Sequence, residues 1–297
     1  MFILYFQASF QTFQPTSTDN MIDAPLHLVA FVDILGFSQI IQEFDKGETP
    51  AILEELKNAL DPAVSLIKPN GFKFPGDNPF YDWKECLTAK LFSDCLCVAV
   101  PMTYKGYSFH EQLRMLYMYL SSYQSMLMEQ GYLTRGGITI GSYYSDENMI
   151  FSGGLVEAYQ LESKVAKFPR VILSERLREA VLAEQQLYAH LNRIMFVEDG
   201  DSQVFINHFN YNMLHSDYLD NELEQLLGPN GVISTSFLEL DTNEKRRQLE
   251  TVKGIYEGKQ KAGLDARVAE KYQWILDFAE YELMGDNSRG FNSWPRA

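Results

Sequence analysis

The sequence predicts an α+β fold, in which helices cover a mixed sheet and a helical extension follows at the C-terminal end. Two observations support this prediction. Short apolar runs of strand length, such as residues 28–32, are followed by segments whose apolar residues recur every three or four positions. A hairpin pattern at residues 89–101 interrupts that alternation, so antiparallel strands are expected beside parallel ones.

Composition limits the classes of function. The chain has 297 residues, enough to bury a sizeable core, and a formal net charge of −15. That charge argues against a nucleic-acid partner and against an anionic membrane surface. Three cysteines and five histidines without paired spacing argue against a zinc site and favour a reducing cytoplasm. No apolar run is long enough to span a bilayer, so we expect a soluble, cytoplasmic protein.

The pattern divides the chain into three parts. Residues 1–24 are expected to be an irregular lead-in, residues 25–208 an α+β domain, and residues 209–297 a helical extension. The extension is expected to pack on the core or on a second subunit, because its helical pattern is amphipathic.

The first strand carries one acid. Residues 28–32 are apolar, Asp33 follows them, and the chain then breaks at Gly36. A carboxylate at the end of a buried strand is costly unless its charge is offset, and a metal ion does this well. The amides of Gly36, Phe37 and Ser38 would lie at a helix N-terminus, where phosphate can bind. The alternative is that Asp33 only caps the helix or forms a salt bridge.

Helical spacing continues at residues 38–44 and again at residues 51–67, where Pro62 interrupts the pattern. Residues 68–83 are rich in Gly, Pro, Asn and Asp and predict a long surface loop.

The hairpin at residues 89–101 turns at Ser93 and Asp94. A neighbouring strand could bring the Asp94 carboxylate next to Asp33, and two carboxylates on adjacent strand ends commonly hold Mg²⁺ or Mn²⁺. The alternative is that Asp94 only forms the turn.

A long helix is expected at residues 107–130 and a strand at residues 132–144. Gly136 and Gly137 lie inside that strand and indicate the close approach of another backbone or of a ligand. Arg135 comes directly before them.

The later elements follow the same signals. They are a turn at 146–151, a helix at 155–168 opened by two glycines, a strand at 170–173, a helix at 175–184 capped by Ser174, a hairpin at 193–207 turned at Asp199 and Gly200, and helices from 209 to 285. This order is close to the ferredoxin-like plan.

Four motifs give the sequence a family resemblance. Residues 31–38, FVDILGFS, match F-x-D-I-x-G-F-[ST], and residues 90–94, KLFSD, resemble K-x-x-G-D with Ser93 in place of glycine. Residues 137–141 resemble a G-I-x-x-G strand, and residues 153–163 resemble a helix that ends in L-E-S. Over about residues 26–185 the chain therefore resembles the catalytic domain of class III nucleotidyl cyclases.

The resemblance implies a cyclase-like palm, with the active site at the interface of a head-to-tail homodimer. It implies two ions, Mg²⁺ or Mn²⁺, held by Asp33, Asp94 and the carbonyl of Ile34, and a nucleoside triphosphate substrate. Lys90 falls where purine-specific members carry a base-reading residue; the alternative is an ordinary lysine at a strand edge.

Two positions depart from the family pattern. Val156 and Gln160 stand where the family usually has an asparagine and an arginine that orient the ribose and stabilise the transition state. Arg135 is the candidate replacement, and the alternative is that it forms a structural salt bridge.

Two functions follow. In the first, the chain is an active cyclase that resembles the stand-alone bacterial cyclases of Pycsar-type antiphage defence and makes cyclic UMP or cyclic CMP from UTP or CTP. In the second, it is a catalytically inactive module that binds nucleotide or dimerises. The two aspartates favour the first function, and the missing Asn/Arg pair favours the second.

Overall fold

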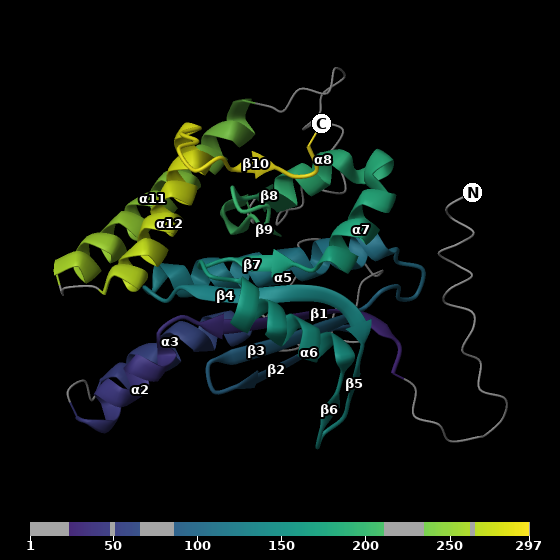
Figure 1. The fold of residues 1–297 in the computed structure, drawn as a ribbon, viewed down its shortest axis with the longest axis horizontal. Coiled ribbons are helices and arrows are strands. Elements are labelled where there is room, and N and C mark those ends of the chain that lie inside the picture. The colour runs from purple at the N-terminus through teal and green to yellow at the C-terminus, as the bar shows by residue number, and fades with distance from the viewer. Residues whose placement is uncertain (1–23, 48–50, 66–85, 211–234, 262–264, 297) are drawn as a thin grey trace.

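The structure is a computed structural model of the chain, and it describes residues 24–47, 51–65, 86–210, 235–261 and 265–296. An eight-stranded mixed sheet has helices on both faces and a pair of long helices beside it (Figure 1). The predicted α+β class, a mixed sheet with covering helices, is confirmed. Among the described helices, none combines the length and the apolar composition needed to cross a bilayer.

Some predictions fall outside the described residues. They are the lead-in, of which only residue 24 is described, the loop at 68–83, and the part of the helical extension between 211 and 234. The division of the chain at residue 208 stays a prediction.

Strand β1 (Leu26–Ile34) lies antiparallel between β3 (Cys95–Pro101) and β4 (Thr134–Ser142). Its residues 28–32 are at most 5% exposed, because helices cover the sheet above and below them. β2 (Thr88–Phe92) pairs with β3 and forms one edge of the sheet. The hairpin predicted from the sequence is therefore confirmed.

The other half of the sheet begins with β7 (Val171–Leu173), which runs parallel to β4. β9 (Val204–Ile206), β8 (Phe196–Glu198) and β10 (Asn292–Ser293) follow in that spatial order. The pairing of β8 with β9 confirms the predicted hairpin that turns at Asp199. Sequence reasoning missed β10, because two polar residues carry no strand pattern and pairing with β8 alone makes them a strand.

One face of the sheet is covered by α5 (Phe109–Glu129) and α3 (Ile52–Ser65), which share the main hydrophobic cluster with β1 and β3. α5 begins at a capping box. The Ser108 hydroxyl accepts a hydrogen bond from the backbone N–H of Glu111, and the Glu111 carboxylate accepts one from the backbone N–H of Ser108. α2 (Phe37–Asp45) connects β1 to α3.

α7 (Glu175–Ala183) starts at Ser174, whose hydroxyl accepts the amide of Leu177, as the sequence predicts. Sequence reasoning missed the next helix, α8 (Gln185–Met195). Because this helix continues through residue 195, the strand that was expected from residue 193 begins only at Phe196.

The opposite face is covered by α6 (Gly153–Gln160) and by a π-helical turn, η1 (Leu161–Val165). A Cβ placed on Gly137 would lie 2.4 Å from the Leu161 Cβ, and one on Gly136 would lie 2.4 Å from the Phe31 carbonyl oxygen. The close approach predicted at these two glycines is confirmed.

The prediction of one regular helix over residues 155–168 is wrong. The helix begins at Gly153, widens at Leu161 and ends at Val165. The wider turn lets two consecutive side chains face the sheet, since Leu161 packs over Gly137 while Glu162 is only 3% exposed. Turns of this kind are frequent at functional sites.

The C-terminal helices α11 (Thr235–Lys261) and α12 (Ala266–Met284) share a second hydrophobic cluster with the sheet. Trp274 and Phe278 of α12 pack against Phe205 of β9, with ring centroids 5.3 Å and 4.9 Å apart. Burial of such large aromatic side chains is a major source of stability.

A buried polar contact fixes the position of α12. Trp274 donates its Nε1–H to the Asp199 carboxylate at 2.7 Å. The same carboxylate pairs with Arg170, which is 0% exposed and also pairs with Asp201. The β8–β9 turn and α12 are therefore joined through one buried carboxylate.

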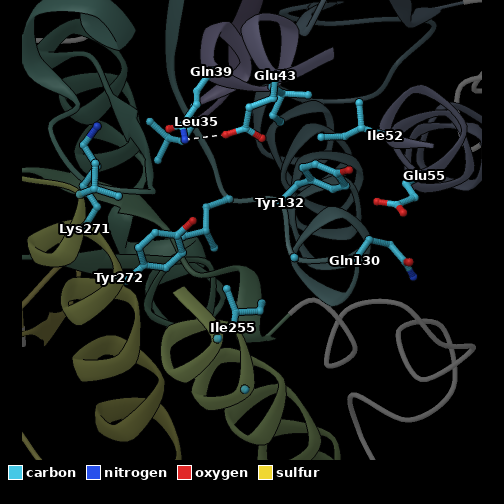
Figure 2. A pocket seen from close by; sticks show the side chains of 17 residues that line it. Leu35, Gln39, Glu43, Ile52, Glu55, Gln130, Tyr132, Ile255, Lys271 and Tyr272 are labelled. Atoms are coloured by element: carbon cyan, nitrogen blue, oxygen red, sulfur yellow. Dashed lines mark hydrogen bonds between the residues drawn. The ribbon is translucent and has the colours of Figure 1, made fainter. Parts of the chain in front are cut away.

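A cavity of about 740 Å³ lies where α2 and α3 approach α11 and α12 (Figure 2). Leu35 and Gly36, the link between β1 and α2, line one side of it, and Lys271 and Tyr272 of α12 line another. The C-terminal extension therefore reaches the link between β1 and α2, which begins two residues after Asp33.

We predict that Asp199→Ala lowers the free energy of unfolding by about 3–5 kcal/mol, because it removes one partner of a buried ion pair. Urea denaturation followed by tryptophan fluorescence measures this change. Asp201→Ala is the matched control: Asp201 pairs with the same arginine, but its side chain is 42% exposed, so a smaller loss is expected. Equal losses in the two variants would contradict the role given to Asp199.

Candidate functional site

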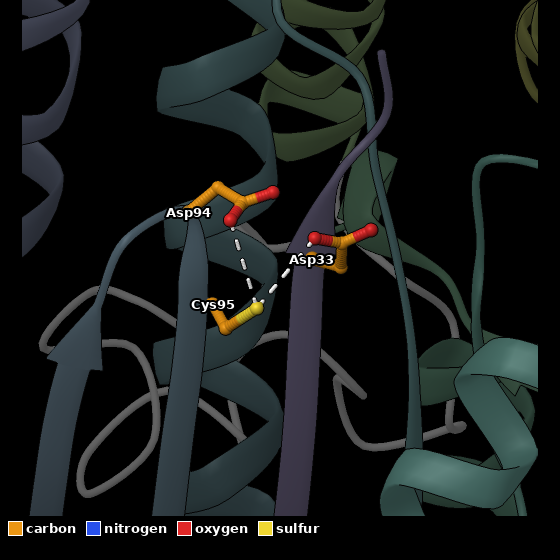
Figure 3. Close-up of side chains that lie close together, drawn as sticks. All are labelled: Asp33, Asp94 and Cys95. Atoms are coloured by element: carbon orange, nitrogen blue, oxygen red, sulfur yellow. Dashed lines mark hydrogen bonds between the residues drawn. The ribbon is translucent and has the colours of Figure 1, made fainter. Parts of the chain in front are cut away.

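The structure brings Asp33 and Asp94 together. Asp33 is the last residue but one of β1, and Asp94 lies in the turn between β2 and β3, where Ser93 has a positive φ of 58°. The Cys95 Sγ lies 3.7 Å from an Asp33 oxygen and 3.8 Å from an Asp94 oxygen (Figure 3). One ligand atom from each of the three residues lies within 4.8 Å of the other two.

The two carboxylates repel each other in a half-buried setting. Burial raises the pKa of Asp33 to about 7, and the hydrogen bond and charge of Asp94 and the charge of Glu162 add to the increase. Arg135 acts in the opposite direction but is outweighed. Without a cation, the pair therefore keeps a proton near neutral pH. Two carboxylates that share a site in this way suit a hard divalent ion such as Mg²⁺ or Mn²⁺.

Arg135 lies beside this pair. It stands opposite Asp33 in the register of β4 with β1, and its Nη2 is 3.8 Å from an Asp33 oxygen. Its Nε is 2.5 Å from a carboxylate oxygen of Glu162, which the turn η1 directs inward. Arg135 is thus both a member of an ion pair and a cation at the candidate site, so the geometry is compatible with both of its predicted roles.

Glu162 is the residue that sequence reasoning passed over. In the sequence it is part of the L-E-S motif, and nothing else in the sequence gives it a role of its own. Its side chain is 4% exposed, and burial raises its pKa against the opposing effect of Arg135. The L-E-S motif was the available signal for Glu162. The residue that pairs with Glu162, Arg135, is 27 residues earlier in the chain.

The start of α2 is open to an anion. Gly36 precedes the helix in the left-handed conformation, with φ of 84°, and no side chain caps this end. Gln39 and Ile40 donate their amides to the Gly36 carbonyl at 3.0 Å and 3.2 Å. The amides of Phe37 and Ser38 belong to the first turn, where helices present their N–H groups. Ile34 ends β1 between Asp33 and this turn.

Lys90 lies on β2 and is not brought into the carboxylate cluster. Its ammonium donates to the Asp146 carbonyl in the turn between β5 (Tyr144–Ser145) and β6 (Ile150–Phe151). The predicted turn at residues 146–151 is confirmed for residues 146–149, which form the tip of a small hairpin, whereas residues 150 and 151 belong to strand β6. Lys90 connects β2 to this hairpin.

Exposed apolar side chains lie at the end of β2, on the β5–β6 hairpin and on α6. Tyr159 is 51% exposed, and its ring meets that of Phe31 edge-on, with centroids 5.6 Å apart. Val156 is 56% exposed on the same helix, and Gln160 is also exposed. We call the exposed members of this group the apolar rim: Phe92, Met149, Phe151, Val156 and Tyr159.

Comparison with known proteins finds similar arrangements among solved structures. No family model matches the sequence, and no curated protein matches it. A class III adenylyl cyclase-like ATP-binding protein from Pseudomonas aeruginosa superimposes with a TM-score of 0.41 and 9% identity over 64% of this chain and 40% of that one. The guanylyl cyclase Cya2 gives a TM-score of 0.32 and 12% identity over 54% of this chain and 80% of that one.

This chain thus spans about 40% of the length of the first of these proteins. At this level of similarity, neither likeness identifies an activity.

We predict that Asp33→Asn stabilises the metal-free protein at pH 8. The folded pKa of about 7 exceeds the unfolded value of 3.8, so the folded state holds the proton more tightly. The free energy of unfolding of the native chain then falls as pH rises from about 4 through about 7. Relative to the native chain, the variant should gain on the order of 3 kcal/mol at pH 8 and nothing near pH 4.

Urea denaturation in the presence of a chelator, repeated between pH 4 and pH 8, measures this difference. Asp45→Asn, which removes an exposed carboxylate at the end of α2, controls for net charge. A constant difference between the native chain and Asp33→Asn across this range would show that the Asp33 pKa is not raised.

Proposed function

We propose that this protein is a nucleotidyl cyclase, which converts a nucleoside triphosphate into a 3′,5′-cyclic nucleoside monophosphate and pyrophosphate. The observation that supports it most is the convergence of Asp33 and Asp94 at neighbouring strand ends, next to an uncapped helix N-terminus. The motif resemblance, which runs over about residues 26–185, points to the same reaction.

Asp33 and Asp94, with the carbonyl of Ile34, would hold two Mg²⁺ or Mn²⁺ ions. The oxygen donors and their mutual repulsion fit such ions. When bound, the ions would favour ionisation of the ribose 3′-hydroxyl and offset charge on the phosphates.

The chain's own groups bind and orient the triphosphate. The first-turn amides of α2 at Gly36, Phe37 and Ser38 donate to phosphate oxygens. Arg135 turns part of its guanidinium from Glu162 toward the α-phosphate and stabilises the charge that develops when the bond to pyrophosphate breaks. Asp33 lies 3.8 Å from this guanidinium and keeps it at the site.

The favoured substrate is UTP or CTP, and the product is a signal in antiphage defence. This part of the proposal rests on the resemblance to stand-alone cyclases of the Pycsar type and on the replacement of the usual Asn/Arg pair by Val156 and Gln160. Lys90, whose ammonium donates to the Asp146 carbonyl of the β5–β6 hairpin, is the candidate for contact with the base.

A second copy of the chain would cover the apolar rim. Its five side chains are between 46% and 65% exposed. An exposed apolar group of this kind beside a polar site commonly marks a protein interface. We therefore place the active site at the interface of a homodimer.

The alternative function is an inactive module that binds nucleotide or dimerises. The observation that favours it is the exposed face of α6, where Val156 and Gln160 offer no positive charge to a transition state.

We predict that the purified protein, given Mn²⁺ and each of ATP, GTP, CTP and UTP in turn, forms a cyclic monophosphate and pyrophosphate from a pyrimidine nucleotide. Asp33→Ala and Asp94→Ala should each abolish the product, while Asp45→Asn should retain it. Chromatography with mass detection measures both products. Binding of nucleotide without any product from the four would favour the inactive module.

We predict that Arg135→Ala lowers kcat by about 100-fold with a smaller effect on KM, because a charge donor to the transition state is lost. Arg135→Lys should recover part of the loss. The melting temperatures of both variants distinguish a role of Arg135 in the transition state from a purely structural role. An unchanged kcat together with a lower melting temperature would show that Arg135 serves only the ion pair with Glu162.

A further inference from the structure

The C-terminal extension places one lysine close to the candidate site. Lys271 of α12 lines the same cavity as Leu35 and Gly36, which are two and three residues after Asp33 in the chain. In Figure 2 the Lys271 side chain lies at the end of the cavity away from Glu55. Its ammonium thus lies toward Leu35 and away from the carboxylate of Glu55 on α3.

The charges that act on Lys271 are those of the site itself. Burial and the charge of Arg135 lower the pKa of Lys271, while Asp33 and Glu162 act in the opposite direction. Within the described ranges, Lys271 forms no ion pair with any carboxylate, whereas Arg135 pairs with both Glu162 and Asp33. The Lys271 ammonium is partly buried. The charges of Asp33 and Glu162 act on it, but it forms no salt bridge with either carboxylate.

A triphosphate would bring several negative charges to a place that already holds Asp33, Asp94 and Glu162. Arg135 is partly neutralised by Glu162, and α6 adds no cation at Val156 or Gln160. Even with the two ions of the proposed function, the phosphates and the three carboxylates carry more negative charge than the ions and Arg135 offset. A further positive group near the start of α2, where the uncapped amides lie, would therefore favour binding.

We propose that Lys271 is a substrate-binding residue, which reaches from the C-terminal extension to the terminal phosphates of a nucleoside triphosphate seated at Asp33, Asp94 and the start of α2. This inference rests on the proposed function. It makes the extension a wall of the active site, and lysine suits the task because its compact ammonium binds phosphate as a point charge.

The test is binding of inorganic tripolyphosphate in the presence of Mn²⁺, measured by isothermal titration calorimetry on the full chain. Lys271→Ala and Lys271→Gln should each weaken tripolyphosphate binding by about 10- to 100-fold, the usual loss for a hydrogen bond to a charged group. Orthophosphate, which is too short to span the site, should bind the native chain and the variants alike. Lys271→Arg should restore most of the affinity.

Arg267→Ala is the matched control, since Arg267 is an exposed cation one turn earlier on α12. It should bind tripolyphosphate as the native chain does. If Arg267→Ala lost as much tripolyphosphate affinity as Lys271→Ala, the loss would reflect only the change in net charge, and the inference would be overturned. Native affinity in Lys271→Ala, or a native chain that does not bind tripolyphosphate, would overturn it as well.

The same variants separate the inference from the proposed function. Binding that depends on Lys271, in a native chain that forms no cyclic nucleotide, overturns the cyclase activity and leaves Lys271 as a phosphate-binding residue. Cyclisation with an unchanged KM in Lys271→Ala overturns the role of Lys271 and leaves the cyclase activity. A changed melting temperature without a change in tripolyphosphate affinity would show a structural role only, and would contradict the proposal.

Discussion

The repulsion between Asp33 and Asp94 is the interaction around which the site is built. The backbone sets the position of each carboxylate. Asp33 lies on the buried strand β1, and Asp94 lies in the β2–β3 turn, which is next to β1 because β3 pairs with β1. Burial, together with the hydrogen bond and the charge of Asp94, raises the pKa of Asp33 to about 7, and a bound cation would oppose this rise.

The surrounding elements place further charged side chains near the two carboxylates. Glycines in β4 let α6 and η1 lie directly on the sheet, and the widened turn of η1 then directs Glu162 toward Arg135. The pair between Asp199 and Arg170 holds α12 against the sheet, and so places Lys271 beside the β1–α2 link. Strand β1, the turn η1 and the C-terminal extension thus place acidic and basic side chains near the same end of β1.

The sequence predicted those features whose signals are local. The apolar run of β1, the turn at Ser93, and the cap at Ser174 each depend on a few adjacent residues, and the structure contains all three. The juxtaposition of the two aspartates followed from the expectation of neighbouring strands. Features that depend on distant residues were missed: β10 forms only against β8, and η1 is shaped by packing over Gly137. Lys271 shows no motif at all, since its place near Asp33 arises only from the docking of α12.

Titration of Mn²⁺ into the metal-free protein, followed by electron paramagnetic resonance, tests the central claim most directly, because the free ion has a strong signal that is lost on binding. The shared-carboxylate site predicts that the native chain and Asp45→Asn bind Mn²⁺, and that Asp33→Asn and Asp94→Asn each bind it much more weakly, since both carboxylates are ligands. Equal Mn²⁺ binding in all four proteins, or none in the native chain, would contradict it.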